Sequence, residues 1–297
     1  MNLYTINCGH FKLDGGAMYG VVPKSIWNGL NPADENNMCS WATRSLLIET
    51  EGRLILVDCG MGDKQSEKFF GYYYLHGDDN LDKSLAQYGF HRDDITDVFL
   101  THLHFDHCGG AIKKEGDKLL PAFKKAVYWS NEAHWKWATH PNPREKASFL
   151  SENILPIKES GQLKFVDHWS SKNDGQSDWH VVIDRKLPEV LFGEDFLVRY
   201  AHGHTDAMML PQVRYNGKTV VFMADLLPSP GHIPLPYVMA YDTRPLITMS
   251  EKEAFLREAL EKEYILFFEH DPKLECCTLK NTERGIRPDQ FFKLSDL

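Results

Sequence analysis

Residues 101–107 read Thr-His-Leu-His-Phe-Asp-His and directly follow an apolar run, 98–100, that is typical of a buried strand. Three imidazoles and one carboxylate therefore gather at the end of a strand. A lone histidine is usually a structural or surface residue, but a cluster of this density offers the nitrogen and oxygen ligands that Zn²⁺ prefers. The sequence therefore predicts a metal site at the end of this strand.

The rest of the chain repeats the pattern of an apolar run followed by a ligand-type residue. His204 follows 196–200, Asp225 follows 220–224 and His270 follows 264–268. If extended geometry continues past residue 100, alternate side chains of the first cluster project to one side, and a turn permitted by the glycines at 109 and 110 brings the last histidine round. One loop could then supply ligands to two neighbouring metals.

The periodicity of apolar residues predicts a mixed fold. Strands are expected at 45–48, 54–57, 98–100, 125–129, 196–200, 219–223 and 264–268. Helices are expected at 81–88, ending at Gly89, and at 251–262, where Ser250 and Glu253 form a capping-box pattern. Strands dominate with helices between them, so the class is α/β or α+β in one domain over 1–297.

Two segments between these elements are less regular. The polar stretch 170–177 is typical of an exposed loop. The segment 111–194 is rich in aromatic residues, which suits either a cap or insert over a site or ordinary core, and the sequence leaves both open.

Composition excludes some functions. The chain has 33 Lys and Arg against 42 Asp and Glu, a net charge of −9 that disfavours nucleic acid as a partner. We find neither a signal peptide nor an apolar run long enough to span a membrane, so a cytoplasmic protein with no membrane partner is expected. Six cysteines without a Cys-x-x-Cys pair indicate reduced thiols, and Cys108 is interpreted as a packing residue rather than a nucleophile.

The ordered motifs His-x-His-x-Asp-His at 102–107, Gly-His-Thr at 203–205, Asp225 and His270 resemble those of the metallo-β-lactamase superfamily. The resemblance covers nearly the whole chain, including Asp58 in 56–60, and implies an αββα sandwich. It implies that two Zn²⁺ ions are held as follows, with Mn, Fe or Co as alternatives: one by His102, His104 and His204, the other by Asp106, His107 and His270, with Asp225 bridging them. Asp58 would orient a ligand.

The opening stretch 13–24, followed by Trp27, looks like the branch that contains N-acyl-homoserine lactonases and related lactone, ester and organophosphate hydrolases. This resemblance implies a quorum-quenching lactonase in which a metal-bridging hydroxide attacks the lactone carbonyl. Asp225 would act as the bridge, and Asp106 or a water would return a proton to the leaving alkoxide.

The acyl chain of such a substrate needs an apolar wall and orienting groups. The candidates are Trp27, Phe69, Tyr72, His232, Tyr237 and Tyr241. His232 suits a structural role equally well, and His202, two residues before His204, is a lesser candidate for contact with metal or substrate. The sequence departs from the lactonases at Pro228, where they carry a tyrosine three residues after the bridging aspartate.

This departure keeps other functions open. One alternative is a different small-ester, lactone or phosphotriester hydrolase with the same metals, and another is a degenerate metal-binding module without activity. Seven candidate ligands exceed the four that a structural zinc needs, which favours the enzyme. The negative charge disfavours a nuclease, and the lack of an export signal disfavours a β-lactamase. A homodimer is expected by analogy, through apolar residues near 18–27.

Overall fold

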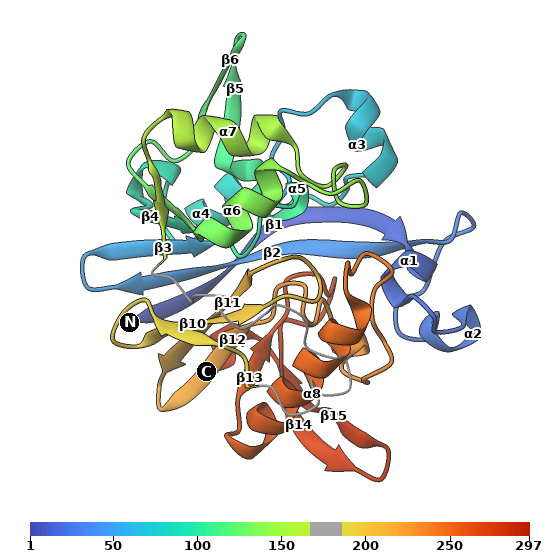
Figure 1. Ribbon diagram of the computed structural model, residues 1–297. Coiled ribbons are helices and arrows are strands. Elements are labelled where there is room, and N and C mark those ends of the chain that lie inside the picture. The colour runs from blue at the N-terminus through green and yellow to red at the C-terminus, as the bar shows by residue number, and fades with distance from the viewer. Residues whose placement is uncertain (167–185) are drawn as a thin grey trace. The chain divides into compact units, whose positions relative to one another are not determined.

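The computed structural model describes residues 1–166 and 186–297 (Figure 1). The chain divides into two compact units. Unit 1 comprises residues 1–11 and 42–166, and unit 2 comprises 12–41 and the described residues from 186 onward. The loop predicted at 170–177 lies outside the described residues. The single domain over 1–297 stays a prediction.

Unit 1 is built on a six-stranded sheet in the order β1-β2-β3-β4-β7-β8. Its strands are β1 Asn2–Asp14, β2 Met38–Thr50, β3 Arg53–Val57, β4 Asp97–Phe99, β7 Val127–Ser130 and β8 Leu163–Phe165. β2 and β3 are antiparallel, whereas β3, β4, β7 and β8 pair in parallel. Because parallel strands end at one edge of a sheet, the segments that follow β3 and β4 emerge side by side.

Helices cover one side of this sheet in unit 1, as Figure 1 shows for α4, α6 and α7. The helices are α3 Glu67–Tyr73, α4 Leu81–Gln87, α5 Phe105–Cys108, α6 Glu132–Thr139 and α7 Ser151–Glu159, and a hairpin is formed by β5 Ile112–Glu115 and β6 Lys118–Pro121. Leu56 and Val98 of the strands pack in one buried cluster with Leu85 of α4 and Trp135 of α6. The predicted helix over 81–88 is confirmed as α4.

Unit 2 contains a seven-stranded sheet in the order β15-β14-β13-β12-β11-β10-β9. The strands are β9 Glu189–Leu191, β10 Phe196–Ala201, β11 Met208–Tyr215, β12 Lys218–Phe222, β13 Ile265–Phe267, β14 Cys276–Thr282 and β15 Gly285–Phe292. β12 and β13 pair in parallel, with Phe222 opposite Phe267, and the other neighbouring strands of this sheet pair antiparallel. A helical crossover joins this parallel pair, as parallel strands require.

The crossover helix is α8, Pro245–Glu261, and it packs beside β14 and β15. The predicted start at 251, with Ser250 in a capping box, is wrong, because Arg244 occupies the N-cap position and Pro245 the first turn. Proline there has the backbone angle that a helix start requires and donates no hydrogen bond that the helix would need. Unit 2 also contains α1 Gly15–Tyr19 and α2 Lys24–Trp27.

These elements confirm the predicted α/β (α+β) class. The expected strands correspond to parts of β2, β3, β4, β7, β10, β12 and β13. The sequence does not predict β1, β5, β6, β8, β9, β11, β14 or β15. Within residues 1–166 and 186–297, no helix has both the length and the apolar composition needed to cross a bilayer.

Candidate metal centre

The motif at 102–107 does not continue as a strand. β4 ends at Phe99, and the short helix α5 begins at Phe105, so Asp106 and His107 lie in a helical turn. The prediction that extended geometry carries the alternation through Asp106 is therefore wrong. His102 and His104 lie in the connecting segment, and all four ligand-type residues of this motif are buried in unit 1.

The glycines after this helix act by close approach rather than by unusual backbone angles. Neither Gly109 nor Gly110 has a positive φ. A Cβ at Gly109 would lie 2.1 Å from the carbonyl oxygen of Met61, and one at Gly110 would lie 2.1 Å from that of Cys59. The glycines therefore let the loop after β3 pack against the metal-ligand motif.

Asp58, directly after β3, connects the two parallel strand ends. Its carboxylate accepts hydrogen bonds from the Thr101 amide at 2.8 Å and the Thr101 hydroxyl at 2.6 Å. It also lies 3.0 Å from Nδ1 of His107, and because a carboxylate only accepts, Nδ1 carries the proton. Nε2 of His107 is then the nitrogen with a lone pair for a metal, which is the usual arrangement of a ligating histidine.

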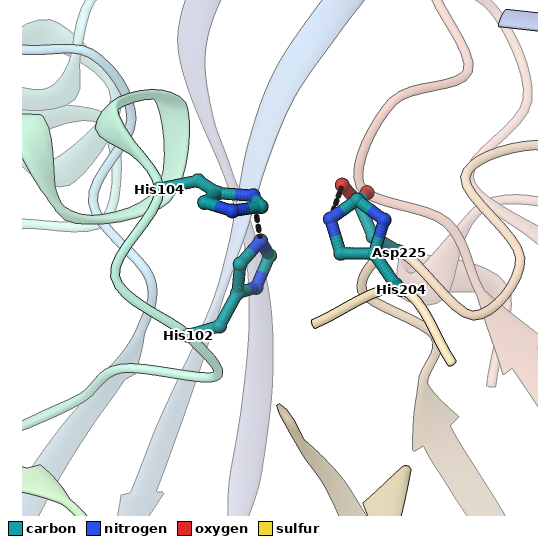
Figure 2. A group of neighbouring side chains, drawn as sticks. All are labelled: His102, His104, His204 and Asp225. Carbon is teal, nitrogen blue, oxygen red and sulfur yellow. Dashed lines mark hydrogen bonds and ion pairs between the residues drawn. The ribbon is translucent and has the colours of Figure 1, made fainter. Parts of the chain in front are cut away.

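His102 and His104 face each other within unit 1, as the left half of Figure 2 shows. Nε2 of His102 lies 3.0 Å from Nδ1 of His104. On the other side of the His104 ring, Nε2 lies 3.5 Å from Oε1 of Glu145. This carboxylate is itself fixed by Trp137, whose Nε1 donates at 2.6 Å, and by Asn142, whose amide donates at 2.7 Å.

The middle segment supports the same loop in two further ways. Nε2 of His134, on α6, accepts a hydrogen bond from the Leu103 amide at 2.9 Å. The ring of Phe149 lies 4.7 Å from that of His104. Phe149 belongs to the buried cluster of unit 1, so the described residues 111–166 contribute core. A cap formed by 111–194 stays a prediction, because 167–185 lie outside the described residues.

Unit 2 brings a carboxylate between two imidazoles. Oδ2 of Asp225 lies 3.1 Å from Nε2 of His204, and Oδ1 lies 3.0 Å from Nε2 of His270. The first of these pairs is the right half of Figure 2. Asp225 and His270 each lie three residues beyond the paired Phe222 and Phe267, so the parallel register of β12 and β13 places them at matching positions.

His204 is held from behind by a second carboxylate. Nδ1 of His204 lies 2.8 Å from Oδ1 of Asp242, which leaves Nε2 directed at Asp225. Burial lowers the pKa of His204, but the carboxylates of Asp225 and Asp242 outweigh it and raise the pKa to about 10. The same negative charge would stabilise a bound cation.

The residues present fit divalent metal ions. Each unit supplies buried imidazole nitrogens and carboxylate oxygens, which are zinc ligands. In His107 and His204 a carboxylate fixes Nδ1 and directs Nε2 away from it. Asp225 presents one oxygen to each of two imidazoles, which suits a carboxylate that contacts two cations. Asp242 and Glu145 were not predicted because they lie in loops and neither directly follows a strand.

The residues predicted to contact substrate lie in different environments. In unit 1, Phe69 packs edge-on against Phe105, and Tyr72 is 62% exposed. In unit 2, Trp27 and His232 are buried, and the ring of each lies nearly parallel to that of Tyr19. Both His232 ring nitrogens have partners, the Ser229 hydroxyl at 2.8 Å and the Met18 carbonyl at 2.9 Å.

The remaining candidates also lie in unit 2. Tyr237 contacts Tyr19 edge-on, and Tyr241 is 40% exposed. Nδ1 of His202 accepts from the Ala207 amide at 3.2 Å. Pro228, where the lactonases carry tyrosine, accepts a hydrogen bond from the His270 amide at 3.2 Å through its carbonyl. The roles of these residues toward a substrate stay predictions.

Cys108 lies beside these ligands in unit 1. It is fully buried, its thiol donates to the Leu103 carbonyl, and burial raises its pKa to about 12. A thiol in this state is a packing group.

The model of the metallo-beta-lactamase superfamily matches residues 41–270. This span contains both ligand sets and most of the two sheets. The chain belongs to the metallo-β-lactamase superfamily.

The curated relatives resemble this chain over only part of their length. The N-acyl homoserine lactonase AiiA of Bacillus thuringiensis subsp. kurstaki is 31% identical over 118 residues, which is 36% of this chain and 43% of that protein. The match thus spans less than half the length of this curated relative.

Two solved structures show the fold over nearly the whole chain. A probable metal-dependent hydrolase from Staphylococcus aureus has a TM-score of 0.83 and 25% identity, covering 98% of this chain and 96% of the other. AidC, a dizinc quorum-quenching lactonase, has a TM-score of 0.74 and 21% identity, covering 98% and 95%. At 21% identity, the similarity to AidC supports the fold alone.

Proposed function

We propose that this protein is a dinuclear metal-dependent hydrolase that opens the ring of N-acyl-homoserine lactones. The observation that carries the proposal is the Asp225 carboxylate, whose two oxygens face Nε2 of His204 and Nε2 of His270. A carboxylate between two imidazoles suits a pair of cations better than a single closed structural site.

The ligands of the pair follow the family pattern. His102, His104 and His204 would hold one ion, Asp106, His107 and His270 would hold the other, and Asp225 would contact both. We propose zinc, and the histidine and aspartate ligands would also accept manganese, iron or cobalt. When bound, the two ions would supply a water-derived nucleophile at neutral pH and polarise the scissile carbonyl.

The chain's own residues would fix this site and handle one proton. Asp58 and Asp242 hold the Nδ1 protons of His107 and His204, so both rings keep one tautomer and one orientation. Asp106, whose side chain is 12% exposed, would return a proton to the leaving alkoxide. A water could perform the same transfer.

The lactone substrate is supported by the similarity to named lactonases and by the motif order. A second candidate, another small ester or a phosphotriester, is favoured by Pro228, because this position lacks the hydroxyl found in the lactonases and its carbonyl is engaged by His270. The quorum-quenching role and the cytoplasmic location are part of the lactonase proposal.

The test is hydrolysis of a short and a long N-acyl-homoserine lactone, followed by proton release at neutral pH, with bound metal counted on the same sample. Asp225→Asn removes one charge without changing the side-chain shape and should abolish turnover and lower the metal count. Asp289→Asn is the matched control, because Asp289 forms a surface ion pair with Lys280.

Activity on aryl esters or phosphotriesters with no turnover of either lactone would reject the substrate and keep the metal site. Two tightly bound metals without turnover on any of these substrates would favour the metal-binding module. Wild-type activity in Asp225→Asn would reject the proposed metal centre.

The predicted homodimer also stays a proposal. Within the segment near 18–27, Val21 is 88% exposed and Ile26 is 52% exposed, whereas Met18 and Trp27 are buried. The molar mass measured by light scattering tests it, with Val21→Asp expected to shift a dimer toward the monomer.

A further inference from the structure

Helix α8 carries two neighbouring charged residues that are almost completely buried. Glu251 and Lys252 are each 1% exposed. Charged side chains are rarely buried to this extent unless they are bound by polar groups. Successive positions on a helix point in different directions, so the two side chains reach different parts of unit 2.

Glu251 reaches the backbone that leads to His204. Its carboxylate accepts hydrogen bonds from the His202 amide at 2.7 Å and from the Gly203 amide at 3.0 Å. β10 ends at Ala201, so these are the first two amides after the strand. Each of its two carboxyl oxygens accepts one of these amides, so the side chain fixes the direction in which the chain leaves the sheet.

The other side of this turn is bound by the residues that precede α8. The carbonyl of Gly203 accepts from the Arg244 amide at 2.8 Å, and that of His204 accepts from the Thr243 amide at 3.0 Å. The backbone of His204 is therefore attached to the start of α8 and to Glu251, which lies about two turns further along the helix.

Lys252 reaches the loop that leads to Asp242. Its ammonium group donates to the carbonyls of Pro234 at 3.1 Å, Leu235 at 3.3 Å and Tyr237 at 2.9 Å. Burial lowers the pKa of Lys252 to about 7, and the three carbonyl acceptors match the three protons of its ammonium form. The same loop continues to Asp242, whose carboxylate holds Nδ1 of His204 at 2.8 Å.

We propose that Glu251 and Lys252 are positioning residues for the metal ligand His204. Glu251 fixes its backbone, and Lys252 fixes the loop whose Asp242 sets the direction of its ring. The inference rests on the proposed function insofar as His204 binds a metal ion. Sites of this kind tolerate displacements of only about 0.2 Å in a ligand atom, so loss of either contact should weaken metal binding.

The test compares Glu251→Gln and Lys252→Met with two controls on the same helix or its end. Glu253→Gln makes the same change at a residue that pairs with Arg257, and Lys262→Met does so at a residue that pairs with Glu258 near the surface. Metal affinity is measured by competition with a chelator. Hydrogen exchange of the 202–204 and 234–242 amides is measured on the metal-free protein.

We expect Glu251→Gln to lower metal affinity 10- to 100-fold and to speed exchange at 202–204. Lys252→Met should speed exchange over 234–242 and lower affinity about tenfold. The controls should match the wild type in both measurements. If Glu251→Gln does not fold, Glu251→Asp keeps the charge but is too short to reach both amides, and the same effects are expected.

The Glu251 and Lys252 variants could fold and unfold at lower urea concentrations, yet bind metal with wild-type affinity. This result would overturn the proposal, because only a general structural role would remain. Unchanged amide exchange in both segments would overturn it as well. If the wild type itself binds no divalent metal, the proposed function fails, and the exchange measurement on metal-free protein still decides whether these two residues fix the His204 turn.

Discussion

The substitution Gly203→Ala tests whether His204 is placed by close packing against α8. A Cβ on Gly203 would lie 2.2 Å from the backbone nitrogen and 2.5 Å from the Cα of Thr248. Ordinary contacts begin near 3.4 Å, so the turn or the helix must move by about 1 Å, which exceeds the roughly 0.2 Å tolerance of a metal site. Because the opposing atoms are backbone, the methyl group cannot be accommodated by a side-chain rotation.

The expected stability cost is about 1–3 kcal/mol from overpacking, measured by urea unfolding of the metal-free protein. Metal affinity should fall at least tenfold in chelator competition, and lactone hydrolysis should fall with it. Gly71→Ala is the control, because nothing lies within 4 Å of a Cβ on Gly71 and its φ is not positive. Replacing this helical glycine should stabilise the protein by about 0.5–1 kcal/mol. Wild-type metal affinity in Gly203→Ala would refute the reasoning.

Three further outcomes are expected. Asp242→Asn should lower metal affinity 10- to 100-fold in chelator competition, because an uncharged amide oxygen is a weaker acceptor for the Nδ1 proton of His204 than a carboxylate; unchanged affinity would contradict this. Burial lowers the pKa of His232 from 6.5 to about 3, so the unfolded chain takes up a proton below pH 6.5 that the folded protein does not. The free energy of unfolding should therefore fall by about 2 kcal/mol from this group between pH 7.5 and 5, and urea titrations of His232→Phe should lack that part of the decrease. Removing metal with a chelator should lower the melting temperature by roughly 5–10 °C in calorimetry if the ions are present at about a hundred times their Kd; no shift would argue against a bound metal.

The sequence was most informative where ligands directly follow strands. Asp58, Asp225 and His270 come within three residues of a buried strand, and the apolar runs predict those strands. The fold class followed from the same runs. Strands such as β1 were missed because their buried residues do not form a continuous apolar segment.

Apart from Asp58, the residues that orient the ligands could not be predicted in this way. Glu145 and Asp242 lie in loops, and each finds its histidine through tertiary contacts that no local spacing encodes. Glu251 and Lys252 belong to a predicted helix, yet their burial depends on the path of the backbone at 202–203 and 234–237. The extended conformation predicted for Asp106 is wrong because only five residues separate the end of the strand β4 from the start of the helix α5.

The register of the parallel pair β12 and β13 places two metal ligands, whereas the loop between these strands can change in sequence without altering that register. Backbone pairing from Val220 opposite Ile265 to Phe222 opposite Phe267 sets where Asp225 and His270 emerge. The chain between these ligands leaves the sheet, forms the 228–243 loop and returns through α8. Substitutions in the outward-facing part of that loop can alter what approaches the site without disturbing the strand register. A family built this way can diversify its substrates while inheriting the same reactive centre.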